Sequence, residues 1–265
     1  MLKEEKPVLL PNERIAYLRT VSELPQIYSD SEKERVFGKN VWGVGNVCPD
    51  YGSTISVGLE YQRNRCMEKM KTADEKQKLF LRCVVDSIDA VLDLAARYRE
   101  EARRVGNDTV ASLLEQIPAK GARTFHEALQ FLRILHFTLW CEGENHNCIG
   151  RFDQFMYPYW EKDIQEGRLT EEEAFSLLEE FFTTFNRDHD LYPGVQQGDN
   201  GQRMMLGGCD REGRPAFNSL SSACLKASRE LLMIDPKINL RVDGRTPADI
   251  YMQGTLLTKA GLGFP

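Results

Sequence analysis

Apolar residues recur at helical spacing through the middle of the chain. The first such run carries an apolar residue every three or four positions: Phe80, Val84, Ile88, Val91, Ala95 and Tyr98. This spacing places them on one face of an α-helix. Thr72 and Glu75 have the spacing of a capping box, in which two side chains bind unpaired backbone N–H groups, so the helix is predicted to start at Thr72. A helix that continues to Arg104 would be roughly 45–50 Å long, which favours a large domain.

Two more capping boxes predict two more helices. Thr124 and Glu127 precede a stretch through Trp140 that is apolar almost all round, which is typical of a helix inside a large protein. Thr170 and Glu173 precede another apolar stripe, formed by Ala174, Leu178, Phe181 and Phe185. The first fifty residues, by contrast, are interrupted by four prolines and predict irregular structure.

The pattern changes after residue 190. Residues 203–207 and 238–242 predict short strands, with a helix between them that carries Leu220, Cys224, Ala227 and Leu231. Thr246 and Pro247 predict the N-cap and first residue of a last helix, and Gly261 its end. The order strand, helix, strand, helix predicts parallel pairing through a right-handed crossover. The fold class is therefore α/β and helix-rich.

Composition excludes several classes of protein. The 265 residues carry a net charge of −6 without a basic block, which argues against binding to nucleic acid. No run of about 18 apolar residues occurs, so no membrane association is expected. The charged first residues do not resemble a signal peptide, and we therefore expect a cytoplasmic protein. The seven cysteines form no Cys-x-x-Cys pair, and we expect thiols, most of them buried.

Polar loops hold the candidate chemistry. In the loop at 143–154, His146 could shuttle protons with Glu144, line a pocket, or suggest a metal site with Cys148, although no second cluster has zinc-like spacing. Arg151 and Asp153 in the same loop are expected to form a structural ion pair. The loop at 192–202 suits either a substrate or plain solvent.

Two further loops have competing interpretations. Residues 207–210 follow a strand, where ligands of parallel sheets bind, but Asp210 to Gly213 also has the sequence of an ordinary turn, and Cys209 is expected to be a packed thiol. Asp50 is expected to pair with Arg63 or Arg65, or to face a ligand. A metal-dependent hydrolase that uses His146, Asp153 and His189 is disfavoured by their spacing.

A longer pattern covers nearly the whole chain. Its strongest part is the run from Gly150 to Trp160, Gly-Arg-Phe-Asp-Gln-Phe-Met-Tyr-Pro-Tyr-Trp. Other parts are Pro49-Asp50-Tyr51, Met205-Leu-Gly-Gly208, Asp235-Pro236, Asn239-Leu-Arg241 and Gly261-Leu-Gly-Phe-Pro265. Together they resemble the pyruvate formate-lyase, or glycyl radical enzyme, family. The resemblance implies that residues 1–265 form part of a β/α barrel wrapped by helices.

The resemblance also implies a mechanism. In the family an iron–sulfur activating enzyme that uses S-adenosylmethionine installs a glycyl radical, which passes to a cysteine whose thiyl abstracts hydrogen from the substrate. Both radical loops lie beyond Pro265 in the family's order, and no cysteine of this chain matches the Gly-Cys-x-Glu-type loop. No catalytic residue, metal or directly bound cofactor is therefore assigned. We expect an incomplete enzyme, inactive alone, whose family cleaves C–C or C–X bonds of small metabolites.

The implied partners are a small-molecule substrate, the activating enzyme, and a complementary C-terminal chain or a second copy in a homodimer. A non-catalytic binding or regulatory protein, or one subunit of a split enzyme, is the alternative. Dehydratase-type members have a histidine where this chain has Asn46, and Gly-His-Ser where it has Glu144-Asn145-His146, which disfavours a diol or choline substrate. The resemblance implies a pocket wall formed by Asn46, Asp50, His146, Asp199 and Asn200.

Overall fold

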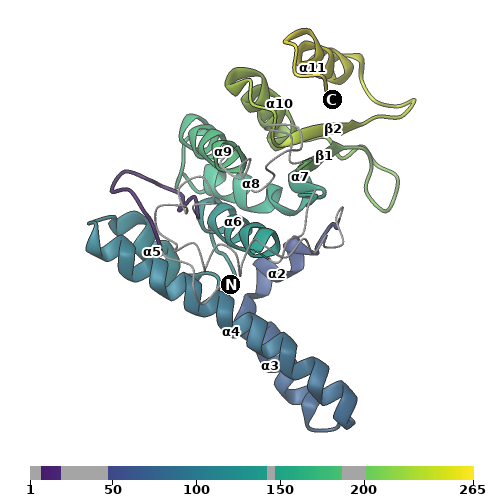
Figure 1. Cartoon of the computed structure of the whole chain (residues 1–265). Helices are drawn as coiled ribbons and strands as arrows, with labels where there is room; N and C mark the ends of the chain where they lie inside the picture. Colours follow the sequence, from purple (N-terminus) through teal and green to yellow (C-terminus); the bar gives the residue numbers. More distant parts are fainter. Residues whose placement is uncertain (1–6, 19–46, 142–146, 187–200) are drawn as a thin grey trace, which may run out of the picture. The chain divides into compact units, whose positions relative to one another are not determined.

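The chain folds as two compact units. The structure is a computed structural model that describes residues 7–18, 47–141, 147–186 and 201–265 (Figure 1). The first unit comprises residues 1–18 and 50–142, and the second comprises residues 19–49 and 143–265. No helix in these described ranges is both long enough and apolar enough to cross a lipid bilayer.

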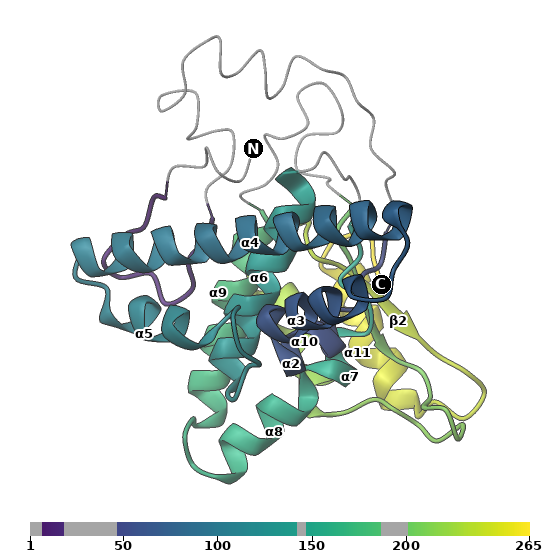
Figure 2. The same ribbon diagram turned by 90° about the horizontal axis from the view of Figure 1, so that it is seen from below.

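The first unit is helical. Its helices are α2 (Tyr51–Val57), α3 (Leu59–Met70), α4 (Glu75–Arg104), α5 (Asp108–Gln116) and α6 (Phe125–Cys141). The helix α4 is the long one that the sequence predicts, and both α3 and α5 pack along it (Figure 2). Its buried residues are concentrated in its C-terminal half, whereas Phe80 near its start is 68% exposed.

The start of α4 differs from the prediction. Asp74 is the N-cap: its carboxylate accepts a hydrogen bond from the backbone N–H of Gln77 (2.8 Å), and the Gln77 amide oxygen accepts one from Asp74 N–H (3.1 Å). The predicted cap at Thr72 is wrong, because the N–H of Thr72 binds the carbonyl of Lys69 (3.3 Å) and Thr72 belongs to the turn that leaves α3.

The helix α6 lies in the interior of the first unit, as predicted. Its buried apolar residues face in several directions: Phe125, Ala128, Leu129, Phe131, Leu132, Ile134 and Phe137. Two of its buried polar residues bind backbone groups of residues 16–17. The Gln130 amide oxygen accepts from Ala16 N–H (2.5 Å), and the Arg133 guanidinium donates to the carbonyl of Tyr17 (2.8 and 2.9 Å). Residues 16–17 are thus held to this helix by its buried polar groups.

Only half of the predicted capping box of α6 forms. The Thr124 hydroxyl accepts from Glu127 N–H (3.2 Å), as expected. The Glu127 carboxylate, however, accepts from the backbone N–H (2.7 Å) and the guanidinium (2.5 Å) of Arg123 instead of from Thr124 N–H. The neighbouring cation outcompetes the neutral backbone donor because a charge-assisted hydrogen bond is the stronger one.

The second unit combines helices with a parallel strand pair. Its elements are α7 (Phe152–Phe155), α8 (Tyr157–Gln165), α9 (Glu171–Phe185), β1 (Arg203–Gly207), α10 (Ser219–Leu231), β2 (Lys237–Arg241) and α11 (Ala248–Lys259). The strands pair in parallel, from Arg203 opposite Lys237 to Gly207 opposite Arg241, as the sequence predicts. The second strand begins one residue before its predicted start. Figure 1 shows α10 and α11 following the two strands in turn.

Two helices of the second unit, α9 and α11, show which residues determine where a helix starts. The capping box of Thr170 and Glu173 forms as predicted at the start of α9. The last helix, α11, starts one residue later than predicted, with Pro247 as its N-cap. The hydroxyl of Thr246 is already used, because it accepts from Asp243 N–H (2.9 Å) and closes the preceding turn.

Aromatic rings from two helices fill the core of this unit. The rings of Phe152 and Phe181 stack with centroids 5.7 Å apart, and Phe181 meets Phe185 edge to face at 4.9 Å. All three side chains are fully buried. The run at 150–155 is therefore fixed to α9 by packing as well as by hydrogen bonds.

The assignment of the α4 N-cap can be tested with two alanine variants. Asp74→Ala removes the acceptor of Gln77 N–H and should lower the free energy of unfolding by about 1 kcal/mol. The control Thr72→Ala should change it by less than about 0.5 kcal/mol. Urea denaturation followed by circular dichroism measures both, and an equal loss in the control would contradict the assignment.

Candidate functional site

The carboxyl end of β1 turns on two glycines. Gly207 and Gly208 have φ angles of 69° and 76°, which side chains rarely adopt. A Cβ atom at Gly207 would also lie 3.2 Å from the carbonyl oxygen of Arg241 on β2. Gly208 N–H donates to that same carbonyl (2.9 Å) and extends the strand pairing by one bond. This turn sets the direction of the chain beyond the strand.

Arg151 holds the turn from the carbonyl side. Its guanidinium donates to the carbonyl of Gly207 (2.8 Å) and to that of Cys209 (3.0 Å). The expected ion pair between Arg151 and Asp153 is wrong: within the described residues, Arg151 binds backbone carbonyls and the Asp153 carboxylate has other donors. Arginine suits this role because its rigid fork offers several donors in one plane.

Asp153 holds the turn from the amide side. Its Oδ2 atom accepts from Gly207 N–H (2.6 Å) and from the Ser221 hydroxyl (2.6 Å), and the side chain is fully buried. Burial raises the pKa of Asp153 above its usual range, and these hydrogen bonds and the charge of Arg151 only partly oppose that effect. Burial, with a smaller contribution from Asp153, also raises the pKa of the Cys224 thiol.

The same carboxylate joins β1 to the start of α10. The Ser221 hydroxyl that donates to Asp153 also accepts from Asn218 N–H (3.0 Å), and the Asn218 side chain accepts from Ser221 N–H (3.0 Å). The Asn218 amide then donates to the backbone carbonyl of Asp153 (2.8 Å). This capping box thus makes two contacts with Asp153. The sequence shows Asn218 and Ser221 but gives no sign that they meet Asp153, 65 and 68 positions away.

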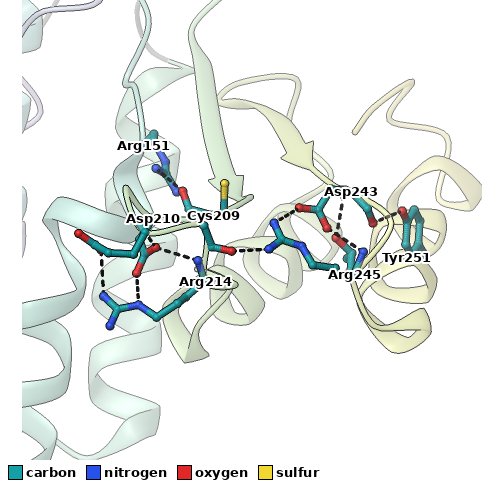
Figure 3. Close-up of polar contacts among 10 residues, drawn as sticks. Arg151, Cys209, Asp210, Arg214, Asp243, Arg245 and Tyr251 are labelled. Carbon is teal, nitrogen blue, oxygen red and sulfur yellow. Dashed lines mark hydrogen bonds and ion pairs between the residues drawn. The ribbon is translucent and has the colours of Figure 1, made fainter.

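Ion pairs fill the surface beyond the two strands (Figure 3). Asp210 Oδ2 accepts from the Arg214 guanidinium (2.6 Å), and its Oδ1 accepts from the backbone N–H groups of Glu212 and Arg214. Residues 210–213 thus form the ordinary turn that was one of the two interpretations. Arg245 donates to Asp243 (2.7 Å) and to the Gly213 carbonyl (2.6 Å). These bonds lower the pKa of Asp210 and of Asp243, so both are ionised and neutralised by arginines at neutral pH.

Three backbone segments lie side by side at the other end of β1. Cys148 N–H donates to the Val47 carbonyl (2.9 Å), and Ile149 N–H donates to the Arg203 carbonyl (2.7 Å). Met205 N–H donates to the Gly150 carbonyl (2.8 Å), and Gly150 forms a parallel bridge with Met204. The segments at 47–48 and 148–150 therefore extend the pair of β1 and β2 on the β1 side.

Four of the five predicted pocket residues lie outside the described residues: Asn46, His146, Asp199 and Asn200. Each of them closely precedes one of the three joined segments. Gln202, which follows them before β1, is buried, and its amide donates to Phe185 carbonyl (3.0 Å) and to Asp235 Oδ2 (3.1 Å). The backbone next to the predicted residues is thus firmly anchored.

The fifth predicted residue, Asp50, belongs to the first unit and caps a helix. Its Oδ1 atom accepts from Ser53 N–H (3.1 Å) at the start of α2, and the residue is exposed. The predicted pairing with Arg63 or Arg65 is wrong, because Arg63 binds Asp89 (2.6 Å) and Arg65 donates to Gln62 (3.1 Å). Both arginines bind residues of the helices α3 and α4 instead of Asp50.

The part of the chain that the structure describes contains no group of three or more metal-binding side chains. His146 and His189 of the disfavoured hydrolase interpretation lie outside it. It does contain an open groove of about 720 Å³, which the sequence did not reveal. Helices α8 to α11 line this groove, with Trp160 and Phe175 among the apolar residues and Lys226 4.0 Å above the Phe175 ring centroid.

The contribution of the buried Asp153 carboxylate to the free energy of unfolding can be measured by removing it. Asp153→Ala leaves the N–H of Gly207 buried without an acceptor and removes the closer of the two acceptors of the Ser221 hydroxyl, so it should cost about 2–4 kcal/mol of unfolding free energy. Asp210→Ala, at the exposed turn, should cost less than about 1 kcal/mol. Denaturant titration of both variants checks this, and similar losses would show that Asp153 has no special role.

A pH series tests the protonation of the same group. Because the pKa of Asp153 is raised in the folded state, its ionisation lowers stability as pH rises from about 4 through the folded-state pKa. Asp153→Asn should therefore gain stability relative to the parent chain over this range. Asp210→Asn should shift the opposite way at lower pH, because the pKa of Asp210 is lowered. Thermal melts between pH 2.5 and 7 measure both differences, and parallel trends would refute the assignment.

Comparisons with known proteins agree with this architecture. A family model described as pyruvate formate lyase-like matches residues 22–265. An isethionate sulfite-lyase of Nitratidesulfovibrio vulgaris is 28% identical over 242 residues, covering 82% of this chain and 29% of that protein. A (2S)-3-sulfopropanediol dehydratase of Klebsiella oxytoca is 27% identical over 270 residues, covering 92% and 33%.

Solved structures give the same result. The glycerol-bound B12-independent glycerol dehydratase of Clostridium butyricum aligns with a TM-score of 0.77 and 27% identity, over 92% of this chain and 35% of that one. This likeness confirms the predicted fold class, a helix-rich part of a glycyl radical enzyme barrel. The chain spans about a third of the length of the relatives it matches. From the match over residues 22–265 it follows that the chain belongs to the pyruvate formate lyase-like family of glycyl radical enzymes.

Proposed function

We propose that this chain supplies part of the substrate pocket of an enzyme that breaks a carbon–carbon or carbon–heteroatom bond of a small metabolite. The similar proteins are named as a sulfite-lyase and as dehydratases, names that describe the elimination of sulfite or water. The chain itself contains no Gly-Cys-x-Glu run. The thiyl chemistry is therefore assigned to polypeptide other than these 265 residues.

One observation carries the proposal of a pocket wall. The hydrogen bonds from Cys148 to Val47 and from Ile149 to Arg203 bring together three segments that are distant in the sequence. Asn46, His146, Asp199 and Asn200 are attached to the amino ends of these segments, within three positions of a bonded residue. Such anchoring fixes the described backbone that follows each of these residues in the sequence, which supports a common site.

The proposed residues can bind a small polar metabolite without doing the radical step. A carboxylate such as Asp199 accepts from substrate hydroxyls, the amides of Asn46 and Asn200 donate and accept, and His146 can hold a proton near an anionic group. Asp50 remains a proposed contributor on its own unit, where Oδ1 caps α2 and Oδ2 takes no part in that cap. The radical, when present, supplies hydrogen-atom abstraction.

The proposed partners follow from the same assignment. They are the small substrate, the S-adenosylmethionine-dependent activating enzyme, and a complementary polypeptide or second copy. The edge of β2 opposite β1 pairs with no strand among the described residues, which supports a further polypeptide there. Free thiols at six of the seven cysteines fit a reducing compartment, and we place the protein in the cytoplasm on that ground.

A split enzyme or a binding protein without catalysis is the second candidate. One observation favours it: a 4-hydroxyphenylacetate decarboxylase component of Clostridioides difficile, 32% identical over 171 residues, is itself named as a glycyl radical subunit. In that case the chain would bind the metabolite or a partner chain but complete no turnover.

Anaerobic incubation with a radical-generating activating enzyme and S-adenosylmethionine tests the assignment of the radical to other polypeptide. The 265-residue chain alone should give no glycyl doublet in the electron paramagnetic resonance spectrum and no product. A doublet from the isolated chain would contradict the assignment of the radical to other polypeptide.

Ligand binding tests the pocket wall independently. The chain should show a thermal shift with isethionate, the compound named in one of the similar proteins, and His146→Ala or Asp199→Ala should weaken that binding about tenfold or more. Asp249→Asn, on the exposed start of α11, is the matched control and should bind normally. Equal binding by all variants would rule out these residues as the wall.

A further inference from the structure

Two cysteines that are 100 positions apart lie on neighbouring segments of the second unit. The N–H of Cys148 donates to the carbonyl of Val47 (2.9 Å). In the β1–β2 pair, Lys237 N–H likewise binds the carbonyl of Gln202, the residue before its partner Arg203. Because the N–H of a residue in this parallel pairing binds the carbonyl of the residue before its partner, the bond from Cys148 to Val47 makes Cys48 the register partner of Cys148.

The position of the Cys48 sulfur supports this register. Gly150 has a φ of 73°, and a Cβ atom there would lie 3.0 Å from Cys48 Sγ. The Cys48 side chain therefore lies across the segment that contains Cys148. Cys148 precedes Gly150 by two positions and occupies the register position opposite Cys48.

Both thiols lie on the accessible side of their segments. Cys48 is exposed and Cys148 is half-buried, whereas Ile149 between Cys148 and Gly150 is fully buried. The pKa of the Cys48 thiol is raised by partial burial and, to a lesser degree, by Cys148, which again indicates that the two sulfurs are close. Small oxidants can therefore reach the pair without unfolding of the unit.

We propose that Cys48 and Cys148 form a reversible disulfide when the protein meets a hydroperoxide. One thiolate attacks the peroxide O–O bond and becomes a sulfenic acid, with release of one water molecule once protons are counted. The second thiolate attacks that sulfur, the S–O bond breaks, and a second water leaves. In total, two thiols lose two protons and two electrons, and one hydrogen peroxide becomes two water molecules. The inference does not depend on the proposed function.

The other described cysteines provide controls within the same chain. Cys66 lies on α3 and Cys83 on α4, and both are at least partly accessible. Cys224 is fully buried in α10. Accessibility alone would oxidise Cys83 as readily as Cys48, so a selective bond between Cys48 and Cys148 depends on their register.

The test treats the reduced, native 265-residue chain with hydrogen peroxide at pH 8, blocks remaining thiols with N-ethylmaleimide, and maps peptides by mass spectrometry without reduction. The expected result is one dominant intramolecular peptide pair that joins Cys48 to Cys148, lost on treatment with dithiothreitol. Cys148→Ser should abolish it and leave Cys48 as a sulfenic acid or higher oxide. Cys66→Ser and Cys83→Ser should leave it unchanged.

Two results would overturn the proposal. One is oxidation of Cys48 to higher oxides in the native chain while Cys148 still reacts with N-ethylmaleimide. The other is a Cys48–Cys148 yield no greater than that of other cysteine pairs when the same treatment is repeated in 8 M urea. Because the urea sample needs no folded structure, a variant that fails to fold cannot be mistaken for a variant that fails to cross-link.

Discussion

The carboxylate of Asp153 is fixed at the junction of three elements of the second unit. It belongs to α7, it accepts from the last residue of β1, and it accepts from the first turn of α10. A buried carboxylate is tolerated only where fixed donors replace water. The direction in which the chain leaves β1, and the place where α10 begins, therefore both depend on one side chain, with Arg151 bracing the same turn from its carbonyl side.

The outer polar groups of this region do a different job. Arg214, Asp243 and Arg245 are exposed and Asp210 is half-buried, so solvent screens both pairs and each adds little to stability. Their arrangement instead fixes two loops against one another through the bond from Arg245 to the Gly213 carbonyl. The inner network determines the fold, and the outer one determines loop geometry.

The sequence predicts those parts of the architecture that depend on residues close to one another in the chain. The box at Thr170, the strand at 203–207 and the parallel pairing appear as predicted, because each depends on neighbouring residues or on a periodic pattern. Errors arise where two local signals compete, as for Thr72 against Asp74, and where a charged residue has a choice of distant partners, as for Asp153 and Arg63. The spacing of residues in the sequence does not predict a hydrogen-bond partner 54 or 68 positions away. The pocket candidates came from family resemblance, and apart from Asp50 they lie outside the described residues.

The bond between Val47 and Cys148 has a consequence for how this architecture can change. It means that the chain leaves the second unit at residue 49 and re-enters it at residue 143, a few residues from two backbone positions in direct contact. Residues 50–142, which form most of the first unit, thus lie in the sequence between two residues of the second unit that are hydrogen-bonded to each other. A change in the length of a loop within residues 50–142 would therefore leave the bond between Val47 and Cys148, and the strand register of the second unit, in place.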